Sequence, residues 1–212
     1  GFAPAADVPA HAKFNHDPSA GYRGYKSDLF EGGHRVPFIA HWPAVIKAGS
    51  TTDALVEQLD LFATCAELLA AKTPATAAED SVSFLPLLRG ETAPSSARTT
   101  LVAHSAEGRF SIRDGRWKLL LWPGSGGWSS PTPAPSQWLK THRTDLATLP
   151  PFQLYDLSAD PAETTNVAAA HPEVVTTQHP RERVGPRGYA VELWAFFWRR
   201  RFTSPPTTTV GV

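Results

Sequence analysis

Charged side chains and glycines are concentrated in one short stretch near the start of the chain, and Lys26 is the residue there best suited to chemistry. Arg23 and Lys26 precede a second charged, glycine-containing group at residues 31–35, which leads directly into an apolar run. A lysine at the edge of an α/β sheet, where such proteins bind ligands, could hold an oxyanion or protonate a leaving alkoxide. The alternative interpretation is a loop whose charges pair with one another, for example Glu31 with Arg35.

Other chemically active residue types show no catalytic or metal-binding pattern. The eight histidines are not spaced as metal ligands, and no aspartate cluster suggests a hard-cation site. Cys65 lies on the apolar face of an expected helix, which favours buried packing over a nucleophilic role. Ser105 lacks the strained turn of a nucleophile, and the glycine-rich residues 124–127 lack the lysine and helix of a phosphate loop, so a flexible loop is expected there.

Two elements should follow Lys26 and hold it in place. The apolar residues 36–43 are bounded by glycines and a proline, which predicts a strand buried on both faces. Asp60 can cap a helix with an apolar face; the residues on that face are Leu61, Phe62, Cys65, Leu68 and Leu69. A strand followed by an amphipathic helix indicates an α/β fold.

The middle of the chain predicts a small antiparallel sheet. Strands at 110–113 and 116–119 flank Asp114-Gly115, a pair typical of a type I′ hairpin turn. This register places Ile112 opposite Trp117 and Phe110 opposite Leu119. Residues 101–103 and 152–155 are further candidate strands, and the cap-like sequence 160–163 predicts a short helix after them.

Composition limits the class of protein. The 212 residues are 42% hydrophobic and carry 20 basic and 20 acidic groups, so no net charge draws the chain to nucleic acid. No run approaches the roughly 18 apolar residues of a membrane span. The Pro-rich segment 123–151 is long for a loop, and residues 177–212 differ in composition from the rest, being basic and apolar.

A family resemblance appears once these blocks are aligned in order. The sequences His16-Asp-Pro-Ser, Arg23-Gly-Tyr-Lys-Ser-Asp and Glu31-Gly-Gly-His-Arg-Val-Pro-Phe-Ile resemble the C-terminal half of formylglycine-dependent sulfatases. These are arylsulfatase A-like enzymes, and the block at 123–131 is similar to their bacterial branch. The resemblance extends through residues 60–64, 83–90, 112–119 and 154–157 and covers about residues 1–176.

The resemblance implies an α/β fold: the C-terminal part of an alkaline-phosphatase-like α/β domain, followed by a small antiparallel β-subdomain with a packed helix. We expect residues 1–95 to belong to the first part. Residues 96–176, with the long loop 123–151, should form the second. Residues 177–212 are a divergent tail, either a shifted reading frame, which we favour, or a genuine extension.

The resemblance also implies hydrolysis of sulfate esters of an aryl or sugar compound by a formylglycine nucleophile with calcium. Lys26 matches the family lysine that contacts the sulfate and stabilises the leaving oxygen. Cys65 is followed by Ala-Glu-Leu and does not match the formylglycine precursor, while Gly1 matches the glycine of an Asp-Asn-Gly turn that carries calcium ligands. We therefore expect the nucleophile and the calcium ligands to lie upstream, in a missing N-terminal half. We also expect this chain to bind no metal and to have no sulfatase activity by itself.

Substrate-binding candidates are Arg23, His104 and Trp128, with Trp138 in the same long loop, because aromatic side chains suit sugar or aryl groups; alternatively, the two tryptophans only fix the loop. The expected partner is a sulfate ester or sulfated glycan, and the family implies a periplasmic or secreted location. Two alternatives remain: a non-catalytic module that binds a glycan or a protein partner, and a phosphoester or phosphonate hydrolase of the same fold.

Overall fold

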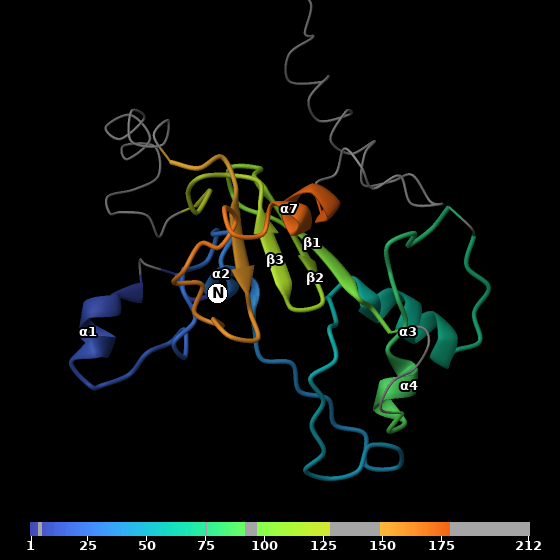
Figure 1. Cartoon of the computed structure of the whole chain (residues 1–212). Coiled ribbons are helices and arrows are strands. Elements are labelled where there is room, and N and C mark those ends of the chain that lie inside the picture. Colours follow the sequence, from blue (N-terminus) through green and yellow to red (C-terminus); the bar gives the residue numbers. More distant parts are fainter. Residues whose placement is uncertain (4–5, 75, 92–96, 128–148, 179–212) are drawn as a thin grey trace, which may run out of the picture. The chain divides into compact units, whose positions relative to one another are not determined.

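The computed structural model describes residues 1–3, 6–74, 76–91, 97–127 and 149–178, which Figure 1 draws in colour. The chain divides into two compact units, residues 1–166 and 167–212. The first unit contains the helices α1 (Val8–Ala12), α2 (Glu31–His34), α3 (Asp60–Leu68) and α4 (Leu85–Leu88), and the strands β1 (Thr100–His104), β2 (Phe110–Asp114), β3 (Trp117–Leu120) and β4 (Gln153–Asp156). Helix α7 (Pro172–Gln178) belongs to the second unit.

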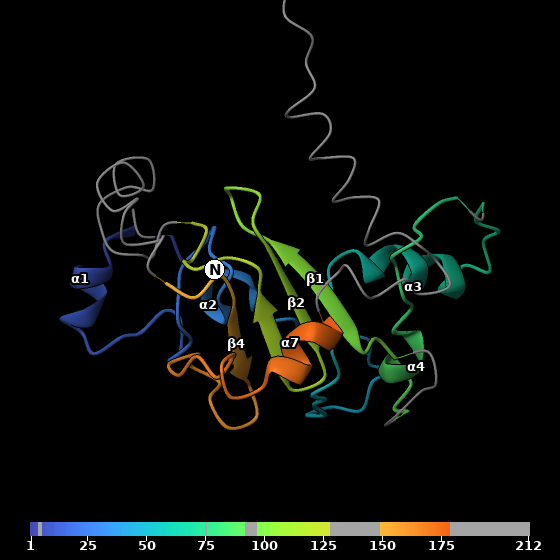
Figure 2. The ribbon, with the colours of Figure 1, turned by 45° about the horizontal axis from the view of Figure 1, so that its top comes forward.

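The strands form one antiparallel sheet in the order β1-β2-β3-β4, as Figure 2 shows. The predicted hairpin is present, but its register differs by two residues: Ile112 lies opposite Leu119, and Asp114 lies opposite Trp117. Gly115 has a φ of 57°, whereas Arg116 is not in the left-handed region, so the turn needs a glycine at its first central position only. Asp114 is therefore free to extend the strand, and the predicted register is wrong.

The sheet packs one face against the segment that follows Lys26. Leu29 and Phe30 form a core cluster with Leu120 of β3 and Tyr155 of β4, and all of them are almost completely buried. Burial of a large apolar side chain contributes about 1.5–3 kcal/mol. The residues next to Lys26 are thus fixed by the sheet and not left as a mobile loop.

The expected buried strand at residues 36–43 is not formed. The segment has no regular secondary structure, and Val36, Phe38 and Ile39 are 49%, 53% and 89% exposed. A strand with two apolar faces is stable only between neighbouring strands and covering layers. No strand pairs with residues 36–43 in the parts of the chain that are described.

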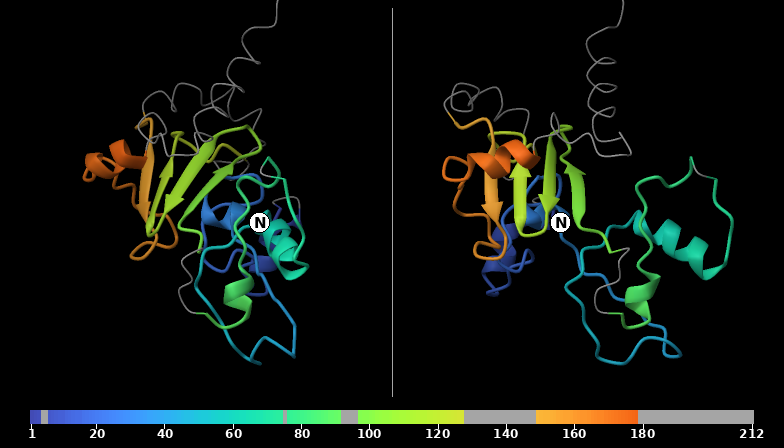
Figure 3. Two further views of the ribbon diagram at one scale, coloured as in Figure 1. Left: turned by 90° about the vertical axis from the view of Figure 1, so that its right-hand side faces the viewer. Right: turned by 45° about the vertical axis from the view of Figure 1, so that its right-hand side comes forward.

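Helix α3 forms where it was predicted, but its buried side is the polar one. Asp60 and Thr64 are buried, whereas Leu61, Phe62, Leu68 and Leu69 are 44–75% exposed. Cys65 is exposed as well, so the expectation of a buried thiol is wrong. The helix contacts α4, and the two lie near each other in the ribbon views of Figure 3. The Phe84 N–H, just before α4, donates to the Thr64 hydroxyl oxygen of α3 at 3.0 Å.

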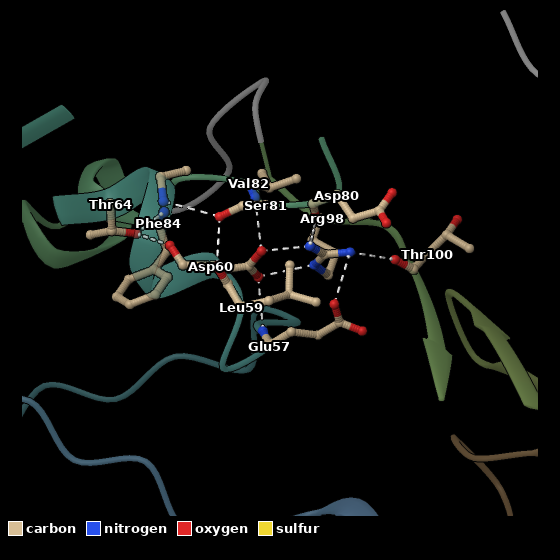
Figure 4. Close-up of polar contacts among 11 residues, drawn as sticks. Glu57, Leu59, Asp60, Thr64, Asp80, Ser81, Val82, Phe84, Arg98 and Thr100 are labelled. Atoms are coloured by element: carbon tan, nitrogen blue, oxygen red, sulfur yellow. Dashed lines mark hydrogen bonds and ion pairs between the residues drawn. The ribbon is translucent and has the colours of Figure 1, made fainter. Parts of the chain in front are cut away.

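Asp60 anchors α3 but does not cap it. Its carboxylate accepts hydrogen bonds from the backbone N–H groups of Glu57 and Val82, each at 2.8 Å, and pairs with Arg98 (Figure 4). Arg98 in turn donates to the carbonyl oxygen of Thr100 at the start of β1. One buried ion pair therefore connects α3 to the sheet.

The helix predicted from the sequence 160–163 is also absent. Asp160 accepts from the backbone N–H groups of Thr164 and Thr165 and closes a turn. Glu163 has a φ of 53°, which interrupts a helix, and its side chain is fully buried. The described helices include none long and apolar enough to cross a membrane.

Candidate active site

Lys26 lies on a strained turn whose backbone is held on several sides. Its N–H donates to the carbonyl oxygen of Phe2 at 2.8 Å. Ser27 has a φ of 86°, a conformation that costs a non-glycine residue of order 1–3 kcal/mol. The Ser27 carbonyl oxygen accepts from the Ala106 N–H at 3.0 Å, so the sheet region holds the strained residue in place.

The Lys26 ammonium is exposed and makes no hydrogen bond or ion pair with any residue that the structure describes. Lys118, on β3, is by contrast buried between two carboxylates. A side-chain ammonium that is held on a rigid backbone and has no partner within the described structure is well placed to bind an external anion. Geometry therefore favours the chemical interpretation of Lys26 over a loop in which every charge is paired.

Asp28 and the glycine-rich residues 124–127 pack against this turn. Asp28 is fully buried, and its Oδ2 accepts from the Tyr25 N–H at 2.6 Å. A Cβ on Gly127 would lie 2.3 Å from the Ser27 carbonyl oxygen. Residues 124–127 are buried, and Ser125 accepts from the Leu29 N–H at 2.8 Å. The expectation of a flexible loop is wrong here, because close backbone approach is what requires these glycines.

Helix α2 closes the other side of the turn with its own two glycines. The Gly32 N–H donates to the Arg23 carbonyl oxygen at 2.7 Å. A Cβ on Gly32 would lie 2.4 Å from the Gly24 carbonyl oxygen, and one on Gly33 would lie 2.4 Å from the Asp28 carbonyl oxygen. The pair of glycines thus lets α2 lie directly against the Lys26 turn.

A buried charge cluster anchors α2 to the sheet. The Lys118 ammonium lies 2.9 Å from Glu31 Oε1 and 3.0 Å from Glu163 Oε1. Burial acts to raise the pKa of Glu31, but the positive charges of Lys118, Arg113 and Arg35 outweigh it and hold that pKa below its usual value. Burial raises the pKa of Glu163, against the opposing effect of Lys118. The suggested Glu31–Arg35 pair is present, at 3.8 Å.

Arg23 makes structural contacts with residues of the sheet region and with Phe30. Its Nη1 donates to the Glu163 carbonyl oxygen at 2.8 Å and to the Tyr155 hydroxyl at 3.3 Å, and its guanidinium stacks 4.0 Å from the centre of the Phe30 ring. These contacts fix the start of the Lys26 turn. They leave Arg23 less suited to binding substrate than Lys26 is.

His104 ends β1 and is exposed. Its Nδ1 lies 3.0 Å from the Ser105 carbonyl oxygen, a contact that assigns the proton of the neutral ring to Nδ1 and leaves Nε2 as an acceptor. Trp128 and Trp138, the aromatic candidates, lie outside the described residues.

His34, at the end of α2, is a residue that sequence reasoning passed over. Its Nε2 is buried and has no hydrogen-bond partner in the described part of the chain. Burial, with Lys118 next in importance, lowers the pKa of His34 to about 4, so the ring is neutral at neutral pH. His34 follows Glu31 by three residues, a spacing that places both side chains on the same side of a helical turn. This spacing is the sequence signal that could have indicated His34.

The described residues contain no group of three His, Cys, Asp or Glu side chains that could hold a metal ion. They therefore do not fit a calcium site by themselves, and the position of the calcium ligands stays a prediction.

Comparison with known proteins identifies the family to which this chain belongs. Residues 25–125 match the family model for the C-terminal region of N-sulphoglucosamine sulphohydrolase. An N-acetylgalactosamine-6-O-sulfatase of Bacteroides thetaiotaomicron is 40% identical over 160 residues, which cover 76% of this chain and 29% of the relative. Arylsulfatase A of Bos taurus is 35% identical over 181 residues, covering 82% of this chain and 34% of the relative.

A solved structure agrees with these sequence matches. It comes from work on the metabolism of multiple glycosaminoglycans by Bacteroides thetaiotaomicron, and it is 38% identical with a TM-score of 0.63, covering 81% of this chain and 33% of that one. The chain belongs to the sulfatases, and the predicted fold, the C-terminal part of an alkaline-phosphatase-like domain with a small antiparallel sheet, is confirmed. It spans about a third of the length of these relatives.

Proposed function

We propose that this chain is the C-terminal part of a sulfate ester hydrolase in which Lys26 contacts the sulfate and stabilises the leaving oxygen. The observation that carries the proposal is the combination at Lys26 of a strained, hydrogen-bonded backbone with an ammonium that has no partner among the described residues. Cleavage of the S–O bond places negative charge on the ester oxygen as the alcohol departs. A preorganised cation there lowers the barrier, either as a charge or by donating a proton.

The other parts of the reaction are proposed to come from residues outside this chain. In the sulfatases that the chain resembles, a formylglycine supplies the nucleophile and calcium orients the sulfate. Cys65 lacks the sequence of a formylglycine precursor, and the described residues form no metal site. We therefore expect the 212-residue chain by itself to release no alcohol from an aryl sulfate, and measurable release would contradict this.

Gly1 lies against the Lys26 turn. A Cβ on Gly1 would lie 2.9 Å from the Lys26 backbone nitrogen and 2.1 Å from the Gly32 carbonyl oxygen, and Phe2 accepts the Lys26 N–H. Any residues joined before Gly1 would thus begin beside the Lys26 turn. This is where calcium ligands would have to lie to act on the same sulfate group.

The missing N-terminal part of the enzyme is also proposed to cover an exposed apolar surface. This apolar surface consists of Val36, Phe38, Ile39, Leu61, Phe62, Leu68 and Leu69. The Phe38 ring packs edge-on against Phe84, with ring centres 5.5 Å apart, and the Phe84 N–H donates to Thr64 on the buried side of α3, so Phe84 links the two segments. Water-exposed apolar groups on this scale are typical of an interface.

For the substrate we propose a sulfated sugar of the glycosaminoglycan type. The support is the relative named N-acetylgalactosamine-6-O-sulfatase, whose identity of 40% exceeds the 35% of arylsulfatase A. His104, with Nε2 as an acceptor, and Trp128 are the proposed substrate contacts. A periplasmic or secreted location, as the family resemblance implies, fits a substrate of this kind.

The experiment is a chimera in which the Bacteroides N-acetylgalactosamine-6-O-sulfatase keeps its own residues before the matched region and receives this chain after them. We expect the chimera to release sulfate from 6-sulfated N-acetylgalactosamine. Lys26→Ala should lower kcat at least about 100-fold, and Lys26→Arg should recover part of the loss. Lys47→Ala, the matched exposed control, should change kcat less than 2-fold. Full activity of the Lys26→Ala chimera would refute the proposal.

A further inference from the structure

Glu163 contacts the Lys26 segment at both of its ends. Its carboxylate Oε2 accepts the backbone N–H of Glu31 at 2.6 Å, and its own carbonyl oxygen accepts from Arg23 Nη1 at 2.8 Å. Lys26 lies between Arg23 and Glu31 in the chain. One residue from a turn about 130 residues downstream thus spans the whole segment that presents the ammonium.

The backbone of Glu163 is bent to make both contacts. Its φ of 53° is in the left-handed region, where a glutamate is rarely found. This conformation directs the carboxylate and the carbonyl oxygen toward the same neighbouring segment. The side chain is fully buried, so the conformation is maintained by the surrounding structure and not by solvent.

The contact to Glu31 has a direct effect on α2. Phe30, the residue before the helix, provides no side-chain cap, and the first N–H groups of a helix need an external acceptor. Glu163 supplies one, while the Lys118 ammonium forms ion pairs with both Glu163 and Glu31. Helix α2 then holds the Lys26 turn through the Gly32 N–H to the Arg23 carbonyl oxygen.

From these contacts we infer that Glu163 is a positioning residue for Lys26, with Lys118 as its counter-ion. A buried ion cluster is weak evidence for stability, because apolar replacements are often as stable. Its role here is to fix one geometry of the turn between residues 23 and 31. The inference rests on the proposed role of Lys26 in the reaction. The effect of Glu163 on the order of the turn, however, can be measured without any reaction.

The structural test is hydrogen exchange on the 212-residue chain. Glu163→Ala should speed amide exchange of residues 24–33 at least 10-fold, while β2 and β3 keep their protection. Glu163→Gln keeps an acceptor for the Glu31 N–H and should restore most of the protection. Arg116→Ala, which removes an exposed ion pair with Asp156, is the matched control and should change neither region.

The kinetic test uses the same substitutions in the chimera. Glu163→Ala should lower kcat about 10-fold or more with KM changed less than 3-fold, because Lys26 acts on the leaving oxygen in the transition state. Glu163→Gln should recover kcat to within about 3-fold of the parent. Loss of exchange protection over the whole sheet would show that Glu163 stabilises the fold in general, which would overturn the inference. Faster exchange at residues 24–33 with unchanged kcat would overturn it as well. If Lys26→Ala itself leaves kcat unchanged, the proposed function fails instead, and the exchange result still reports on the turn.

Discussion

Arg98 and Asp60 form a bidentate ion pair, with Arg98 Nε 2.9 Å from Asp60 Oδ2 and Arg98 Nη2 2.5 Å from Asp60 Oδ1. Both side chains are buried or nearly so, and the guanidinium also lies 3.2 Å from Glu57 Oε2. The pair determines which side of α3 faces inward. It holds the polar side of the helix toward Arg98 and residues 81–84 and leaves the apolar side exposed.

Arg98→Met should therefore unfold α3 from the rest of the first unit. Removal of one partner leaves the Asp60 carboxylate buried without its counter-charge, which costs about 3–5 kcal/mol. Urea unfolding followed by tryptophan fluorescence would measure the change. Arg89→Met removes an exposed arginine and should cost less than about 0.5 kcal/mol; an equal loss for both variants would contradict the role of the pair.

His34 should make the chain less stable in acid. The pKa of His34 is lowered from 6.5 to about 4 in the folded chain, so between these pH values the unfolded chain binds a proton that the folded chain does not. The free energy of unfolding should fall as the pH falls from 6.5 to about 4, by about 3 kcal/mol from this residue at about 1.4 kcal/mol per pKa unit.

Replacement of His34 by glutamine removes this proton uptake and should flatten the pH dependence over that range. His41→Gln, at an exposed histidine, should leave the dependence as it is. Urea unfolding at several pH values measures both. Burial acts to raise the pKa values of Asp60 and Glu31, but their ion pairs lower both below their ordinary values, so these carboxylates also lose their stabilising charge in acid, and this loss should persist in the His34 variant.

Sequence patterns predicted the local elements of the fold. They failed where the environment of a residue depends on contacts with residues far away in the sequence. Alternating apolar residues around Asp114-Gly115 predicted the hairpin, because a hairpin depends on neighbours in the chain. The Glu31–Lys118 contact joins residues 87 apart, and the Glu31–Glu163 contact joins residues 132 apart. Neither acid was distinguishable from a surface glutamate by its local sequence.

The predicted strand at residues 36–43 and the predicted burial of the apolar face of α3 failed for a related reason. Apolar periodicity indicates that a face prefers burial, but it does not say which segment covers that face. The sequence therefore identified the apolar residues correctly and assigned them the wrong environment in this chain.

Gly127→Ala should disturb the Lys26 turn. The added Cβ would lie 2.3 Å from the Ser27 carbonyl oxygen and 2.5 Å from Asp28 Oδ1, and relief of such overpacking costs about 1–3 kcal/mol. Thermal unfolding, with hydrogen exchange of residues 24–29, measures the effect. Gly49→Asn is the control, because its Cβ would meet nothing within 4 Å and asparagine tolerates the positive φ there. Equal behaviour of the two variants would contradict close packing at Gly127.

The apolar surface should make the isolated chain self-associate. Ile39 and Leu69 are 89% and 75% exposed, so Ile39→Glu with Leu69→Glu should reduce association in sedimentation experiments without loss of stability. In the chimera the same pair should reduce the yield of folded, active protein, since the surface is then covered. Phe14→Glu, at an exposed residue outside this surface, should have neither effect. Unchanged activity of the doubly substituted chimera would show that the surface is not an interface.

The central claim is that Lys26 stabilises the leaving oxygen, and the most direct measurement compares two leaving groups. Lys26→Ala in the chimera should lower kcat at least about 100-fold for 6-sulfated N-acetylgalactosamine, whose alkoxide is a poor leaving group that needs the cation. For 4-nitrophenyl sulfate, whose phenolate departs without help, the loss should be less than about 10-fold. Equal losses for both esters would contradict a role at the leaving oxygen.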